Sequence, residues 1–186
     1  MTNTEIEDRL AACPIIAAVP SARFAEAIDS PAEIIFNLRA NLLTVKAQIA
    51  AAHAANRAAF VPLDLADGIG TDKTGIEFLA NCGVDGVIST RGQLIRAAKD
   101  CGLLTVQRFF TLDSQGVDSI AEQLRSLSPD FIEIMPGVIG KTVARFAAGG
   151  IPVIAGGLIE TKAEVTEALG NGAVAVSTGK HELWYL

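Results

Sequence analysis

Eight short apolar runs recur along the 186-residue chain, and segments with helical patterning separate them. Several of these runs lack the polar alternation of a half-exposed strand, which is typical of parallel strands buried on both faces. The regular order of strand and helix therefore predicts an α/β fold with a parallel sheet. The runs cover residues 15–19, 34–38, 59–63, 86–88, 103–106, 131–134, 153–155 and 173–176.

The segments between the runs carry helix signals. Thr161 and Glu164 form the pattern of a capping box, which marks the start of a helix after the seventh run. In residues 114–128 apolar side chains recur at three- and four-residue spacing, so that they fall on one helix face. These side chains are Val117, Ile120, Leu124 and Leu127.

Such a chain could form either a doubly wound sheet or a closed barrel. A doubly wound sheet usually has its glycine fingerprint after the first strand, but the stretch "AAVPSARF" contains no glycine. Every run also ends in residues that a binding site would use, as expected where loops converge on one face of a barrel. We therefore predict a compact TIM-type (β/α)8 barrel with a short terminal helix, forming a single domain over residues 1–186.

Composition narrows the range of functions. The 21 acidic residues outnumber the 15 basic ones, and the net charge of −6 disfavours general electrostatic binding of nucleic acid. The three cysteines lack paired metal-site spacing and the two histidines are far apart, so we expect no metal site and no cofactor. No apolar run approaches the roughly 20 residues that span a membrane. We expect a cytoplasmic protein with reduced thiols.

The ends of the last two runs suggest a phosphate site. Gly156 and Gly157 follow the seventh run, while Ser177, Thr178 and Gly179 follow the eighth. In barrels of this type the loops after the seventh and eighth strands often bind phosphate. Glycines there allow backbone N–H groups to approach an anion closely, and a helix start adds the positive end of its dipole. We therefore expect these five residues to bind a phosphate group.

Polar residues at the other run ends leave several roles open. Asp64 follows the third run, Arg91 the fourth, Gln107 and Arg108 the fifth, and Glu133 lies in the sixth. The two arginines could neutralise a phosphate, or they could pair with the two carboxylates in a structural network. The carboxylates could accept hydrogen bonds from ligand hydroxyls, or serve as acid and base. We expect all five residues to line the pocket.

Five stretches in this order resemble the glycerol-3-phosphate-responsive antiterminator family: "GVISTR", "VQRFFTLDS", "FIEIMPGVI", "IPVIAGGLI" and "AVAVSTGKHELW". The resemblance runs from about residue 14 to residue 184. It implies a small (β/α) barrel that senses glycerol 3-phosphate and acts on the leader mRNA of glycerol-utilisation genes, where it allows transcription to pass a terminator. It also implies a regulator and not an enzyme.

The resemblance can be carried over to single residues of this chain. It implies that the phosphate lies on Gly156, Gly157, Ser177 and Thr178, and that Asp64, Arg91, Arg108 and Glu133 line the pocket. The chain departs from the family where Pro62 and Gly70 stand in place of a histidine and a lysine.

Two further interpretations remain beside the regulator. The first is a phosphosugar or phosphate-ester enzyme that uses Asp64 and Glu133 as acid and base. The second is a barrel that binds phosphate esters but no RNA, as the acidic charge suggests. An RNA face would have to be assembled by folding or by homo-oligomerisation. Its candidate cations are Arg91, Arg96, Lys99, Lys141, Arg145 and Lys180.

Overall fold

A computed structural model shows a closed barrel of eight parallel strands that neighbour one another in sequence order, with β8 pairing back onto β1. It describes residues 1–111 and 114–186, without the side chains of residues 114, 115, 117–119, 121 and 125. The predicted barrel and all eight predicted strands are confirmed. The strands are β1 (Ile15–Val19), β2 (Ile34–Asn37), β3 (Ala58–Pro62), β4 (Gly86–Ser89), β5 (Leu104–Phe110), β6 (Phe131–Met135), β7 (Val153–Gly156) and β8 (Ala175–Thr178).

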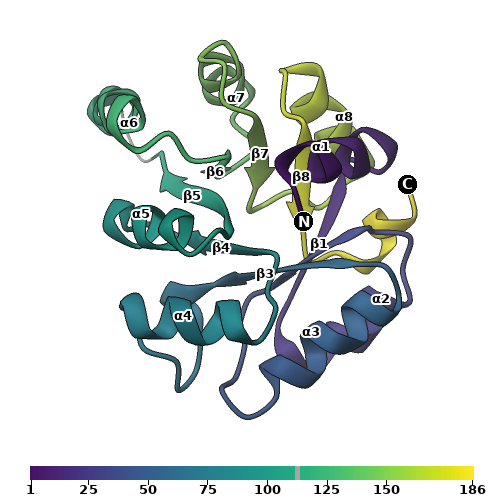
Figure 1. Cartoon of the computed structure of the whole chain (residues 1–186). Coiled ribbons are helices and arrows are strands. Elements are labelled where there is room, and N and C mark those ends of the chain that lie inside the picture. The colour runs from purple at the N-terminus through teal and green to yellow at the C-terminus, as the bar shows by residue number, and fades with distance from the viewer. Residues whose placement is uncertain (112–113) are drawn as a thin grey trace.

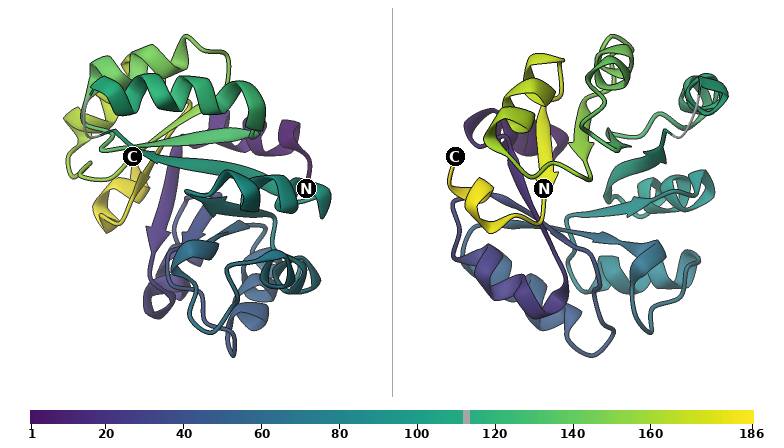
Figure 2. Two further views of the ribbon diagram at one scale, coloured as in Figure 1. Left: turned by 90° about the vertical axis from the view of Figure 1, so that its left-hand side faces the viewer. Right: turned by 180° about the vertical axis from the view of Figure 1, so that it is seen from behind.

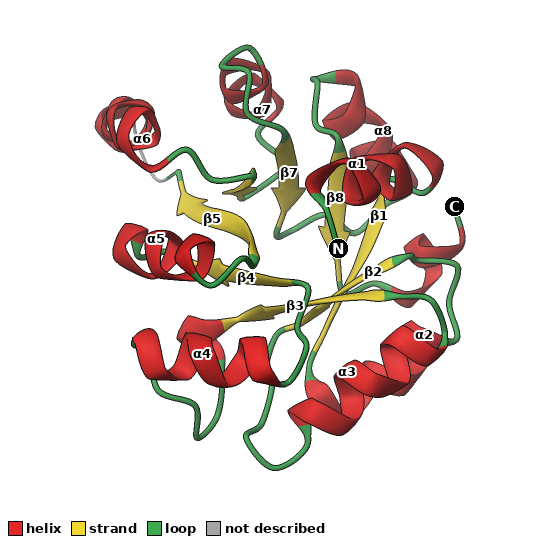
Figure 3. Cartoon of the chain, viewed as in Figure 1, coloured by secondary structure: helices red, strands yellow, loops and turns green. Residues whose placement is uncertain are grey.

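Helices surround the strands as a ring, and each strand is followed by a loop and a helix (Figures 1 and 3). The predicted capping box of α8 is present, with Thr161 and Glu164 each bonding the other's backbone. On α6, Ile120 and Leu127 are buried and Leu124 packs on the core, whereas the side chain of Val117 lies outside the described residues. The helices are α1 (Asn3–Ala12), α2 (Phe24–Ile28), α3 (Val45–Ala54), α4 (Lys73–Asn81), α5 (Gly92–Asp100), α6 (Ser114–Leu127), α7 (Gly140–Ala147) and α8 (Lys162–Gly170), with 3-10 turns η1 (Ser21–Arg23), η2 (Leu63–Leu65) and η3 (His181–Tyr185).

The strands bury apolar side chains on both faces. Ile16, Phe36 and Phe60 belong to one cluster of buried side chains, while Val87 and Ile132 belong to a second cluster that includes side chains from the helices. Successive side chains of a strand point to opposite faces, so each strand contributes to both clusters. This explains why the strands read as apolar runs without alternation.

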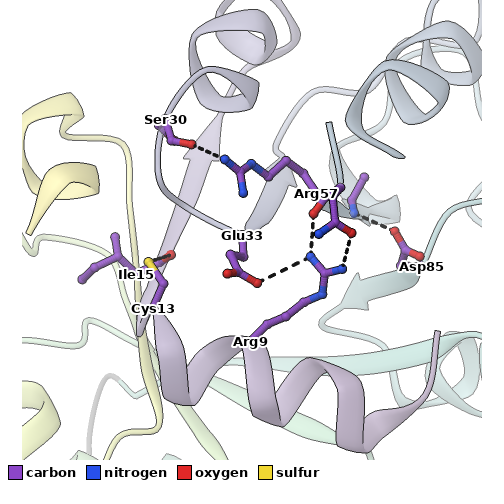
Figure 4. Close-up of polar contacts among 9 residues, drawn as sticks. Arg9, Cys13, Ile15, Ser30, Glu33, Arg57 and Asp85 are labelled. Atoms are coloured by element: carbon purple, nitrogen blue, oxygen red, sulfur yellow. Dashed lines mark hydrogen bonds and ion pairs between the residues drawn. The ribbon is translucent and has the colours of Figure 1, made fainter. Parts of the chain in front are cut away.

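The helix α1, which the pattern of apolar runs did not predict, closes the amino end of the barrel. Its Ile6 and Leu10 pack with the interior side chains, and Thr2 with Glu5 forms a capping box at its start. Arg9 fixes the helix from outside, because its guanidinium donates to Asn56 O (2.6 Å) and pairs with Glu33 (3.6 Å; Figure 4). Apolar packing therefore fills this end.

The last turn η3 holds the C-terminal segment against the barrel. Trp184 is fully buried, and its indole N–H donates to Thr178 O (2.9 Å) at the end of β8. The side view in Figure 2 shows α1 at one end of the barrel and the C-terminal segment toward the other. No helix in the described ranges is both long and apolar enough to cross a membrane.

Candidate functional site

A cavity of about 700 Å³ opens at the carboxyl ends of the strands. Its walls have two kinds of residue. Polar groups and glycines come from the loops after β1, β7 and β8 and from the strands β5, β6 and β8, and apolar side chains come mainly from the ends of β2, β3, β5 and β6. The polar lining residues include Arg23, Arg108, Glu133, Glu160, Ser177, Thr178 and Lys180.

The polar side of the cavity contains a buried network on three strands. Arg108 of β5 donates from Nε to Oε2 of Glu133 on β6 (2.6 Å), and Ser177 of β8 donates from Oγ to Oε1 of the same carboxylate (2.6 Å). Glu133 is 1% exposed and Arg108 is 8% exposed. Both carboxylate oxygens therefore accept from protein donors, and among the described residues the Nη groups of Arg108, which lines the cavity, donate to no protein acceptor.

Gly156 makes room for this network. A Cβ on Gly156 would lie 2.5 Å from Glu133 Oε1 and 2.6 Å from Ser177 Oγ. Any larger residue would push the two side chains apart. Gly156 itself is buried beneath the cavity and does not line it.

The glycines after β7 and β8 offer backbone donors to the cavity. Gly157 has φ +73°, a conformation that strongly favours glycine. The N–H groups of Gly157 and Gly179 donate to no other group in residues 1–111 and 114–186. Such paired amides at the loops after the seventh and eighth strands are typical of a phosphate site in this fold.

Two cations stand beside these amides. Lys180 pairs with Glu160 across the two loops (3.2 Å). Arg23, from the turn after β1, donates to Gly179 O (3.1 Å) and lies 5.2 Å from the centre of the Trp184 ring. Thr178 has a structural role, since its hydroxyl donates to Ile159 O (2.9 Å) and accepts from Lys180 N (3.1 Å).

The start of α8 is neutralised by its own carboxylate. Glu164 accepts hydrogen bonds from the N–H groups of Glu160 (2.8 Å) and Thr161 (2.9 Å). These bonds lower the pKa of Glu164 below its ordinary value, with the Glu160 amide as the largest cause. The N–H groups of Glu160, Thr161 and Glu164 at this helix start therefore already have acceptors.

A second polar cluster lies at the ends of β3, β4 and β5, and its side chains do not line the cavity. Asp64 accepts from Ser89 Oγ (2.9 Å) and Thr90 N (2.7 Å), and Arg91 pairs with it at 3.5 Å. Gln107 donates to Thr90 O (2.8 Å) and is fully buried. Among the predicted pocket residues, Asp64, Arg91 and Gln107 thus form a group of their own.

The structure brings six of the predicted residues to one cavity: Arg108, Glu133, Gly157, Ser177, Thr178 and Gly179. Prediction from the sequence missed Arg23 as a cavity residue, because the turn after β1 carries no glycine or paired motif that marks a site. Lys180 was considered only as an RNA contact. In the described part of the chain, no group of three or more His, Cys, Asp or Glu side chains could hold a metal ion.

Comparison with known proteins agrees with this architecture. Residues 15–184 match the model of a family described as glycerol-3-phosphate responsive antiterminator. A glycerol uptake operon antiterminator regulatory protein from Listeria monocytogenes is 34% identical, with a TM-score of 0.86 over 91% of this chain and 94% of that one.

Two further relatives have similar identity. A glycerol uptake operon antiterminator-related protein from Thermotoga maritima is 33% identical, with a TM-score of 0.83 over 92% of this chain and 98% of that one. An uncharacterized protein from Escherichia coli K12, YgcP, is 34% identical over 93% of this chain and 92% of its own length. The chain belongs to the glycerol-3-phosphate responsive antiterminator family.

Proposed function

We propose that the cavity binds glycerol 3-phosphate, with the phosphate on the amides of Gly157 and Gly179 and the hydroxyls near Arg108 and Glu133. One observation carries the proposal: in the part of the chain that the structure describes, the N–H groups of Gly157 and Gly179 have no acceptor, and both glycines line the same cavity as Arg23 and Lys180, in loops that often bind phosphate in this fold. The buried Arg108–Glu133 pair offers guanidinium donors and a fixed carboxylate, which suit a polyol.

We further propose that the protein acts as a regulator on the leader mRNA of glycerol-utilisation genes. Family membership supports this role. The ligand would bind one conformation or assembly more tightly, and so raise the population that holds RNA. The loops that contribute Gly157, Gly179 and Lys180 would couple the two sites, because they line the cavity and also reach the surface.

Titration calorimetry tests the ligand. Wild type is titrated with glycerol 3-phosphate, glycerol and inorganic phosphate. Gly157→Val places a side chain at φ +73°, and its Cβ would also lie 2.7 Å from Met135 Cε. Gly102→Val is the matched control, because Gly102 has φ +74° and, beyond its chain neighbours, no atom of the described residues lies within 4 Å of its added Cβ. We expect saturable binding of glycerol 3-phosphate that the first variant loses and the second keeps.

Lys180→Gln gives a milder version of this test, since it removes one positive charge and adds no volume at the amides. Unchanged binding in Gly157→Val would contradict the site, and loss of binding in Gly102→Val as well would trace the effect to stability instead. Turnover of the ligand by wild type would favour an enzyme. The RNA role requires that leader RNA binds more tightly when glycerol 3-phosphate is present. If the affinity for leader RNA is the same with and without glycerol 3-phosphate at every salt concentration, the RNA role is refuted.

A further inference from the structure

The cavity is much larger than glycerol 3-phosphate. A volume of about 700 Å³ corresponds to roughly 23 water molecules at about 30 Å³ each. Glycerol 3-phosphate has about ten non-hydrogen atoms, and covalent bonding packs them closer than separate waters. Pockets of about 300–1,000 Å³ hold drug-sized ligands. More than half of the space would therefore stay filled with water beside a three-carbon ligand.

Much of the remaining cavity wall is apolar. Leu38 follows β2, Leu65 follows β3, Phe110 ends β5 and Met135 ends β6, and all four line the cavity. β3 and β5 pair with none of β1, β7 and β8, so Leu65 and Phe110 lie farther round the barrel, whereas β2 pairs with β1 and β6 with β7, and Met135 lies beside Gly157. A polyol phosphate has no group that pairs with these side chains, so this wall suits a second, apolar portion of the ligand.

Several apolar residues that line the cavity are exposed, and one of them, Leu158, directly follows Gly157. Leu158 is 69% exposed, Phe110 is 54% exposed and Leu65 is 46% exposed. Single exposed apolar residues are ordinary, but a cluster around a cavity marks a contact surface. Leu158 also has φ +60°, which is uncommon for a residue with a branched side chain. Neither its exposure nor its backbone conformation stabilises the free protein.

We propose that the cavity takes a phosphate monoester of glycerol that carries an apolar substituent, such as a short acyl chain on the hydroxyl far from the phosphate. The phosphate lies on the amides of Gly157 and Gly179, and the chain extends over Phe110, Leu65 and Leu158. The inference rests on the proposed phosphate site and adds the class of its ligand.

The test measures affinity against chain length. Wild type is titrated with glycerol 3-phosphate and with its 1-acetyl, 1-butyryl and 1-hexanoyl esters, all below their micelle concentrations. Full burial of one CH2 group strengthens binding by about fourfold, and half burial by about twofold. Because Phe110 and Leu65 are about half exposed, we expect a gain of about 16-fold from the acetyl to the hexanoyl ester, at about twofold for each of four CH2 groups.

Matched variants test whether the gain in affinity with chain length comes from the exposed apolar residues that line the cavity. Leu158→Asn removes the apolar side chain with a residue that tolerates positive φ. Leu43→Asn is its control, because Leu43 is exposed and does not line the cavity. Leu158→Asn should keep glycerol 3-phosphate affinity and lose most of the chain-length gain, and Leu43→Asn should keep both. Phe110→Thr is a second variant with the same expectation, and it retains a residue that favours strands.

Three outcomes would overturn the inference. If glycerol 3-phosphate binds and the hexanoyl ester binds no tighter, the class of ligand is wrong and the proposed function stands. If no compound binds, both this inference and the proposed function are wrong. If the chain-length gain persists in Gly157→Val, the esters adsorb to apolar surface outside the phosphate site.

Discussion

Two arginine–carboxylate pairs lie at the same end of the barrel, and they differ in what surrounds them. Arg108 and Glu133 lie on adjacent strands, are almost fully buried and line the cavity. Asp64 lies in the turn η2 and Arg91 directly precedes α5, and the arginine side chain is 51% exposed. A pair taken out of water depends on its partner far more than a pair that water still reaches. The first pair is therefore suited to hold a ligand, and the second to fix loops.

The largest expected effect tests this difference directly. Arg108→Ala leaves the Glu133 carboxylate buried without its cation, and breaking a buried pair in this way costs about 3–5 kcal/mol. Arg91→Ala should cost at most about 1 kcal/mol, because an exposed pair contributes little. Denaturant unfolding of both variants measures the free energy of unfolding. Equal losses of unfolding free energy in the two variants would mean that burial does not make the two ion pairs different in stability.

A matched pair of serines sharpens the comparison. Ser177 and Ser89 are both buried, and each donates to the carboxylate of its cluster. Ser177→Ala should cost about 1.5–3 kcal/mol, as for a hydrogen bond to a charged group. Ser89→Ala should cost about 1 kcal/mol, because Asp64 Oδ2 keeps Thr90 N and Thr90 Oγ1 as donors. Unfolding curves give both values.

Ligand titration of the same two variants provides the functional half of this test. Ser177→Ala should weaken binding of glycerol 3-phosphate, since Glu133 loses one of the two donors that fix it beside the cavity. Ser89→Ala should leave the affinity unchanged, since its cluster does not line the cavity. A weaker affinity in Ser89→Ala alone would reverse the roles assigned to the two pairs.

The residues of the two pairs also show how much of the fold and of the site could be predicted from the sequence. The strands were predictable because barrel strands, buried on both faces, become continuous apolar runs. The sequence places Gln107 and Arg108 on opposite faces of one strand, because side chains alternate. Which of them faces the cavity depends on how the strands pair around the closed barrel, for example Arg108 beside Glu133. Arg23 reaches the cavity only because β1 lies next to β8, which no local pattern indicates.

A third carboxylate gives the smallest expected effect, and it acts at the edge of the proposed phosphate site. Glu164 is exposed to water, yet its pKa is lowered by hydrogen bonds from the amide of Glu160 and from Thr161. A carboxylate whose pKa is lower in the folded state stabilises the protein above its ordinary pKa of 4.5. That contribution is lost as the pH falls through the folded-state value.

Glu164→Gln should therefore lower stability slightly near pH 7 and flatten the loss of stability below about pH 4.5. Glu122→Gln is the control, because Glu122 is an exposed residue within α6 that caps no helix. The measurement is the unfolding midpoint across this pH range, with glycerol 3-phosphate affinity at neutral pH. Unchanged affinity would agree with a phosphate held by the amides of Gly157 and Gly179. A marked change would mean that the start of α8 also contacts the phosphate, because a neutral glutamine side chain cannot offset the positive end of the helix as the carboxylate does.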